Sequence, residues 1–155
     1  MSRDESERTI VRIEKSRVFR VEREAGFDYI TKPANWPEFW PDLVEIPELA
    51  QTRWQEAGDT ARLQMRLAGR VTELHMTLDE LTPPALVRYH STQQGVPDAS
   101  HERYFEPAAG GFEYRLVVSF EPRPGLAGLF DRTVVRYGTS RALRRTVDNL
   151  SQRLR

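Results

Sequence analysis

The sequence predicts an α+β fold: a curved antiparallel sheet of six to seven strands wraps around a long C-terminal helix, with two short helices after the first strand. Apolar and polar residues alternate through much of residues 10–120, as in strands that bury one face and expose the other. Residues 132–154 contain no proline and place apolar residues at helical spacing. Such a helix can cover the apolar face of the sheet.

The first strand is expected at an edge of the sheet, over residues 10–21. Its apolar residues change parity near Ser16, which predicts a β-bulge there. The preceding residues 1–9 are too polar to pack and are expected to form a flexible charged tail. Residues 10–155 are then expected to form a single domain, because a chain of 155 residues is suited to one hydrophobic core.

Two short helices are expected next. Phe27 and Ile30 lie three residues apart, and Pro33 ends the helix that they predict over residues 22–31. Residues 34–42 are rich in proline and aromatic side chains, which favours a single helical turn over a long helix. The aromatic cluster of this turn forms either a cap on the core or an exposed lid; its members are Trp36, Phe39 and Trp40.

The remaining strands are predicted from alternation and from turn residues between them. A strand after Leu43 is interrupted by Pro47, and strands around Leu63 and Leu74 are joined by a turn at residues 68–70. Further strands are expected at residues 87–91 and 100–106. A Gly-Gly turn at residues 110–111 then leads into residues 112–120, where the alternation is clearest.

The C-terminal helix is expected over residues 132–154. One arc of it is apolar or small: Val135, Thr139, Ala142, Leu143, Thr146, Val147, Leu150 and Leu154, with Gly138 at its edge. The first half of this arc is small, at Gly138, Thr139 and Ala142, whereas the second half carries large side chains. A helix that faces a sheet with small residues leaves space there, so the sequence predicts a cavity under the first half.

Four segments resemble one known family. They are residues 27–41 (FDYITKPANWPEFWP), 83–91, 105–107 and 120–129. Together with the order of the elements, they resemble the polyketide cyclase/dehydrase-like branch of the START/Bet v 1-like (SRPBCC) superfamily. The resemblance implies a helix-grip fold that binds a lipid, sterol, polyketide, quinone or hormone, and it implies catalysis for only some members.

Composition and motifs exclude several other classes. The formal net charge is +0, so no overall field attracts nucleic acid or an anionic membrane. The chain has no cysteine and no apolar run long enough to span a membrane. The N-terminal residues lack the apolar run of a signal peptide, and a cytoplasmic protein without integral membrane association or a nucleic-acid partner is expected.

No cofactor and no metal are expected. Of the three histidines, His75 and His90 are expected to face outward, which leaves no three-histidine zinc site. The sequence also lacks a P-loop, a Gly-x-Ser-x-Gly elbow and a dinucleotide-binding glycine fingerprint.

The candidate ligand-binding residues are those expected on the concave face of the sheet and on the small half of the helix. Strand alternation carried back from Phe105 places two polar residues, Arg103 and His101, on the inner face as well. The flexible side chains of two methionines suit an adaptable wall. The full set is Met65, Met76, Tyr89, Ser91, His101, Arg103, Tyr114, Leu116, Gly138 and Ala142.

Arg103 and His101 are open to two interpretations. They either orient a carbonyl, phenol or carboxylate of a ligand, or they lie near the cavity mouth with Arg103 paired to a nearby glutamate. His101, together with Tyr89 or Tyr114, is also a candidate general acid/base pair.

Three functions therefore remain open. The first is the binding of a small hydrophobic or aromatic ligand, and the second is a cofactor-independent aromatase/cyclase or dehydratase acting on a polyketide-like substrate. The third is a quinone-binding or lipid-transfer chaperone. The oligomeric state does not follow from the sequence.

Overall fold

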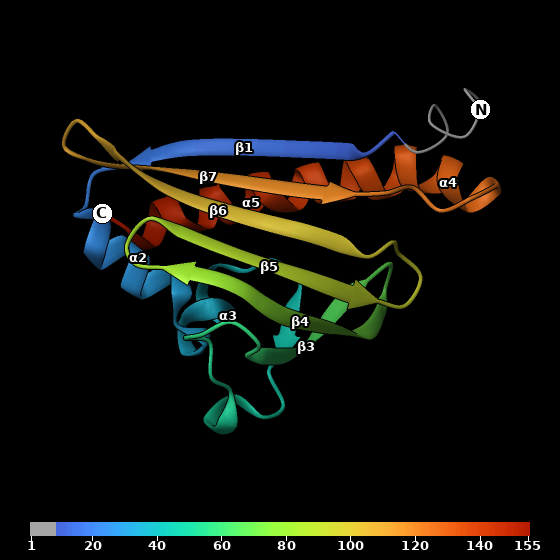
Figure 1. Ribbon diagram of the computed structural model, residues 1–155, viewed down its shortest axis with the longest axis horizontal. Helices are drawn as coiled ribbons and strands as arrows, with labels where there is room; N and C mark the ends of the chain where they lie inside the picture. Colours follow the sequence, from blue (N-terminus) through green and yellow to red (C-terminus); the bar gives the residue numbers. More distant parts are fainter. Residues whose placement is uncertain (1–8) are drawn as a thin grey trace.

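The computed structural model describes residues 9–155. The tail predicted for residues 1–9 lies, apart from Thr9, outside the described residues. Seven antiparallel strands form one sheet in the order β1-β7-β6-β5-β4-β3-β2. Figure 1 shows this sheet lying across a long C-terminal helix, which confirms the predicted helix-grip fold.

The strands are β1 (Val11–Phe19), β2 (Leu43–Glu45), β3 (Thr60–Leu67), β4 (Arg70–Thr82), β5 (Leu86–Gln93), β6 (Ala99–Ala108) and β7 (Gly111–Phe120). Between β1 and β3 lie α2 (Arg23–Thr31), η1 (Pro33–Asn35), α3 (Trp36–Phe39) and η2 (Leu49–Gln51). The chain ends with α4 (Leu126–Phe130), a π-helical turn, η3 (Asp131–Val135), and α5 (Arg136–Arg153).

The bulge predicted near Ser16 is wrong. β1 lies at the edge of the sheet, as expected, but it pairs with β7 in one unbroken register from Val11 to Phe19. The apparent change of parity arises because polar side chains occupy the inner face between Ile13 and Phe19. One of them, Arg17, is held by the C-terminal helix through an ion pair of 2.7 Å to Asp148. A polar residue on the inner face that pairs with a covering helix therefore interrupts the apolar alternation in the same way as a bulge, although the strand register is unbroken.

The sheet has its irregularity in β4 instead. Leu78 pairs with Tyr89 and Glu80 with Arg88, so Asp79 is the extra residue of a bulge. The Asp79 carboxylate lies 2.8 Å from Nδ1 of His90 on the outer face of the sheet. His90 and His75 both face outward, as the alternation predicts.

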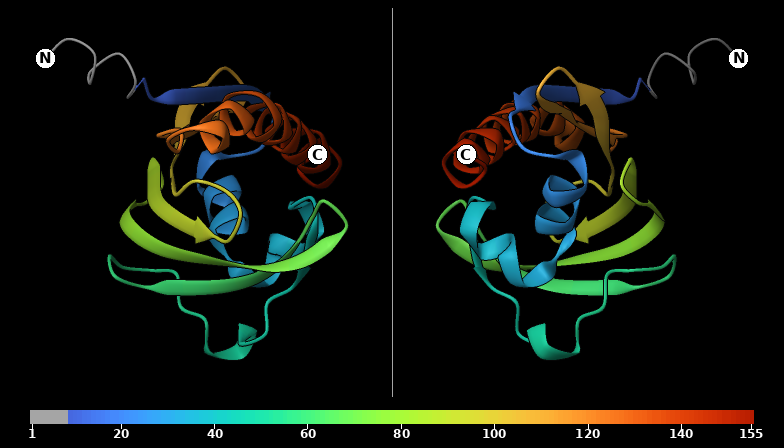
Figure 2. Two further views of the ribbon diagram at one scale, coloured as in Figure 1. Left: turned by 90° about the vertical axis from the view of Figure 1, so that its right-hand side faces the viewer. Right: turned by 90° about the vertical axis from the view of Figure 1, so that its left-hand side faces the viewer.

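The short helices stand across one end of the curved sheet (Figure 2). α2 packs closely because Gly26 lies against the ring of Phe112, where an added Cβ would be 2.4 Å from the ring carbons. The indole of Trp36 donates a hydrogen bond of 2.9 Å to the carbonyl of Ile30. Trp36 and Phe39 are buried and belong to the hydrophobic core, which favours the core cap over the exposed lid.

The C-terminal helical segment begins at Leu126, earlier than the predicted start at residue 132. A buried ion pair holds its first turns: the guanidinium of Arg123 lies 2.7 Å from the fully buried carboxylate of Asp131. Gly128 permits the tight approach, because a Cβ there would lie 2.2 Å from the carbonyl oxygen of Arg123. In the sequence, Gly125 and Gly128 follow Pro122 and Pro124 closely, and such a cluster of prolines and glycines is typical of a loop, so this start could not be recognised from periodicity.

Candidate ligand cavity

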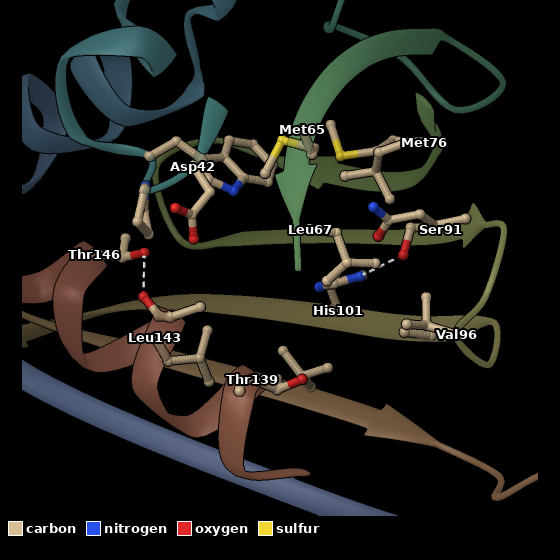
Figure 3. Close-up of a pocket in the computed structure, with 18 of the residues that line it drawn as sticks. Asp42, Met65, Leu67, Met76, Ser91, Val96, His101, Thr139, Leu143 and Thr146 are labelled. Carbon is tan, nitrogen blue, oxygen red and sulfur yellow. Dashed lines mark hydrogen bonds between the residues drawn. The ribbon is translucent and has the colours of Figure 1, made fainter. Parts of the chain in front are cut away.

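A cavity of about 1100 Å³ lies between the concave face of the sheet and the C-terminal helix. Its walls are formed by the inner faces of β3 to β7, by α3 and by the segment from Phe130 to Thr146. Figure 3 shows Met65 and Met76 on the sheet side of the cavity and Thr139, Leu143 and Thr146 on the helix side. The sheet curves away from the helix, so the space between these layers is wider than an ordinary core.

Nine of the ten predicted ligand-binding residues line this cavity: Met65, Met76, Tyr89, Ser91, His101, Arg103, Tyr114, Gly138 and Ala142. The tenth, Leu116, does not. It is fully buried in the hydrophobic core, opposite Arg103 on β6 and Lys15 on β1. Strand parity places Leu116 on the inner face correctly, but parity does not tell where along a strand a core ends and a cavity begins.

The small residues of the helix face open space. Gly138 has no heavy atom within 4 Å of the position where a Cβ would stand, apart from its own neighbourhood in the helix. Thr139 and Ala142 line the cavity beside it. One to two turns further on, Val147 and Leu150 are buried in the core and do not line the cavity. The predicted position of the cavity, under the first half of the helix, agrees with this arrangement.

A series of aromatic rings forms the end of the cavity near α3. Trp36 contacts both Trp40 and Trp54, with ring centroids 5.5 and 5.6 Å apart. Trp54 in turn lies 5.6 Å from Tyr89. The sequence reasoning missed Trp54, because it lies in a loop between η2 and β3 and so has no alternation to mark it. The one sequence feature that could have pointed to Trp54 is that it is a single large aromatic residue within a polar loop.

Arg103 forms the polar centre of the inner wall. Its guanidinium donates a hydrogen bond of 3.1 Å to the hydroxyl of Tyr89 and longer ones, 3.2 and 3.4 Å, to the carbonyls of Glu102 and Val117. The guanidinium carbon also lies 5.5 Å from the centre of the Tyr89 ring. Within residues 9–155, Arg103 forms no ion pair with a carboxylate, so its partners are neutral.

His101 lies beside this arginine. Its ring stacks on Tyr89 at a centroid distance of 4.4 Å, and its Nε2 lies 2.8 Å from the hydroxyl of Ser91 (Figure 3). Burial, together with the positive charge of Arg103 and the proximity of His90, holds the pKa of His101 well below its ordinary value. His101 is therefore neutral at neutral pH. Its Nδ1 is buried and has no hydrogen-bond partner among the described residues.

The two inner tyrosines are hydrogen-bond donors. Burial raises the pKa values of Tyr89 and Tyr114 above the ordinary tyrosine value, although the nearby charge of Arg103 opposes the shift. Both hydroxyls therefore stay protonated at neutral pH. With Arg103, they place several donors on one part of an otherwise largely apolar wall.

The mouth of the cavity carries positive charge that the sequence reasoning did not assign to the site. Four exposed arginines line the cavity: Arg66, Arg70, Arg141 and Arg145. Their sequence positions are typical of solvated faces and turns, and only the curvature of the sheet brings them to one opening. Asp42 also lies at the mouth, 3.4 Å from Arg145.

Two negative observations concern residues 9–155 alone. No helix in this part of the chain is long and apolar enough to cross a membrane. The same residues contain no group of three histidines or carboxylates that could hold a metal ion.

The fold and the cavity define a helix-grip protein with an internal cavity between its sheet and its C-terminal helix. The family described as polyketide cyclase / dehydrase and lipid transport matches residues 11–155. The chain belongs to this family. No curated protein matches the sequence.

Solved structures share the fold at low sequence identity. The di-domain ARO/CYC StfQ from the steffimycin biosynthetic pathway aligns with a TM-score of 0.78 and 14% identity, over 97% of this chain and 52% of StfQ. The protein TTHA0849 from Thermus thermophilus aligns with a TM-score of 0.75 and 14% identity, over 93% of this chain and 97% of that one. A protein from Rhodobacter sphaeroides aligns with a TM-score of 0.72 and 16% identity, over 94% of this chain and 97% of that one. At these identities the likeness concerns the fold alone.

Proposed function

We propose that the protein binds one small hydrophobic or aromatic molecule in the cavity between the sheet and the C-terminal helix. The observation that carries this proposal is the cavity itself. Its volume of about 1100 Å³ is just above the range of roughly 300–1,000 Å³ that is common for small-molecule sites. Membership of a family described by polyketide conversion and lipid transport supports the same class of ligand.

The composition of the wall supports a mainly apolar ligand with a polar end. Met65 and Met76 give an adaptable surface, and Trp36 and Trp54 give flat aromatic surface. Polar groups are concentrated near Arg103, as in sites where a few convergent groups fix the orientation of a ligand.

An apolar fluorescent probe tests the proposal. We expect an environment-sensitive dye to bind at one molecule per folded chain and to be displaced by lipids or polycyclic aromatic compounds. Native mass spectrometry of protein purified from its own host then distinguishes a polyketide-like, quinone or lipid ligand by mass. A folded protein that binds no apolar probe would refute both the proposed ligand binding and the cyclase function.

Catalysis is the second candidate function, favoured by the donors around Arg103. A cyclase or dehydratase must stabilise negative charge on an enol or carbonyl oxygen, and Arg103, Tyr89 and Tyr114 offer donors for such an oxygen. Neutral His101 is available to accept a proton. StfQ, an ARO/CYC, has a similar fold.

The substitution His101→Phe distinguishes the two functions. If the protein is a cyclase, this variant is expected to bind a poly-β-keto substrate analogue but to lose its turnover. If wild-type protein binds the analogue and releases it unchanged, the catalytic candidate is refuted and the binding function stands.

A further inference from the structure

The charge of the cavity wall differs from that of the whole chain. The formal net charge of the protein is +0, but among residues 9–155 the ionisable residues that line the cavity are five arginines and one aspartate, besides His101 and the tyrosines. The five arginines are Arg66, Arg70, Arg103, Arg141 and Arg145. The carboxylate belongs to Asp42, which already pairs with Arg145 at the mouth. A neutral protein has thus concentrated positive charge on the surface that meets the ligand.

Arg103 differs from the other four because it lies on the inner wall. Val87 and Leu116 are its neighbours in the sheet register, and both are buried in the core. Arg103 itself is half-buried, so its positive charge loses part of its hydration, and this loss is costly unless an opposite charge or several hydrogen bonds compensate it. The partners of its guanidinium are two backbone carbonyls and the hydroxyls of Tyr89 and Tyr114, none of which carries a negative charge.

The other ionisable groups beside Arg103 do not supply the missing negative charge. His101 is neutral, and the hydroxyls of Tyr89 and Tyr114 are protonated, since burial opposes the charged form of all three. Among residues 9–155, the acidic residue that lines the cavity is Asp42, which lies with the exposed groups of the mouth.

We propose that the ligand is an apolar molecule with one oxyanion group, such as a carboxylate, and that Arg103 binds this group inside the cavity. This inference rests on the proposed binding function and specifies its ligand class. A guanidinium binds a carboxylate through two parallel hydrogen bonds, which fixes the orientation of the ligand as well as its charge. The hydroxyls of Tyr89 and Tyr114 are placed to donate to the same oxygens. The arginines at the mouth attract such an anion toward the opening.

The test compares two probes that differ only in charge: 11-(dansylamino)undecanoic acid and its primary amide. Fluorescence titration of the wild-type protein is expected to give a dissociation constant at least about 10-fold lower for the acid. Arg103→Leu is expected to raise the dissociation constant of the acid by about 10- to 100-fold, which corresponds to the usual contribution of a hydrogen bond to a charged group. The same variant should change the affinity for the amide by less than about 3-fold.

Arg88→Leu is the matched control. Arg88 lies on the neighbouring strand β5, opposite Glu102, and its side chain is on the outer face of the sheet beside Glu80. The substitution is chemically the same, so a general loss of positive charge would affect both variants. We expect Arg88→Leu to keep the wild-type preference for the acid.

Three results would overturn the inference. Equal affinity of wild-type protein for acid and amide would leave the binding function intact and refute the anionic ligand, whether or not Arg103→Leu folds. Loss of the acid preference in Arg141→Gln but not in Arg103→Leu would place the anion at the mouth. Failure of the wild-type protein to bind either probe or any neutral apolar dye would refute the proposed function itself.

Discussion

The two halves of α5 face the same sheet but border different interiors. Gly138 and Ala142, in its first half, line a cavity, whereas Val147 and Leu150, in its second half, are buried in the hydrophobic core. The helical spacing is the same in both halves, so the difference lies in side-chain volume and in the curvature of the sheet. Small side chains on a helix that faces a receding sheet leave space that the protein does not fill.

The same comparison separates stability from ligand binding. The second half of α5 is also tied to the sheet and to α3 by polar contacts: Asp148 pairs with Arg17, and Asn149 donates a hydrogen bond of 2.9 Å to the carbonyl of Phe39. The first half has no comparable packing against the sheet at Gly138. We therefore expect substitutions in the second half to change the free energy of unfolding and substitutions in the first half to change affinity.

The largest effect is expected from Leu150→Ala. Leu150 is fully buried, so its truncation should lower the free energy of unfolding by about 3–4 kcal/mol, within the range for buried leucines. Urea denaturation measures the change. Leu129→Ala is the matched control, because Leu129 is 60% exposed in the same helical segment and should change stability by less than about 0.5 kcal/mol. Similar losses in both variants would contradict the division of the helix.

A somewhat smaller effect is expected where the helical segment begins. Asp131→Asn removes the charge that pairs with Arg123 and should cost about 3 kcal/mol, the lower end for breaking a buried ion pair, because Arg123 stays partly in water. Asp148→Asn is the control, since Asp148 is exposed and its pair with Arg17 should contribute less than about 1 kcal/mol. Urea denaturation of both variants measures the difference, and equal losses would show that burial does not strengthen the Asp131 pair.

The Asp131 pair also predicts a pH dependence. The hydrogen bonds from Arg123 lower the pKa of Asp131 below its ordinary value. A carboxyl group whose pKa is lower in the folded state stabilises the protein fully above its unfolded pKa of about 4, and this stabilisation is lost as the pH falls through the folded pKa. The stability difference between wild type and Asp131→Asn should therefore be largest at neutral pH and shrink below about pH 4. A difference that stays constant into acid would contradict the assignment.

The sequence predicted the inner face of the sheet well because β5, β6 and β7 alternate regularly. Tyr89, His101 and Arg103 were placed on the cavity side by parity alone, and the unbroken register of β6 with β7 explains why this succeeded. Leu116 is on the predicted inner face but lies in the core and does not line the cavity, because parity fixes the face of a residue but not its depth. The bulge at Ser16 was wrong because Arg17 finds a partner on α5 that a strand pattern does not contain.

Other features depend on curvature and so lie beyond what periodicity can indicate. The exposed arginines of the mouth come from β3, β4 and α5, and Trp54 comes from a loop. Their convergence results from how far the sheet bends around the helix. A local sequence pattern reports which face a residue occupies, but it does not report which distant residue shares that face.

Ala142→Leu tests the central claim, that the first half of α5 covers a cavity used for binding. Leucine there adds bulk to open space, so the free energy of unfolding should stay within about 0.5 kcal/mol of wild type, while affinity for large apolar probes falls at least about 10-fold. Ala61→Leu makes the same change in the packed core, where overpacking typically costs about 1–3 kcal/mol. Destabilisation of Ala142→Leu equal to that of Ala61→Leu, with probe binding unchanged, would contradict the account.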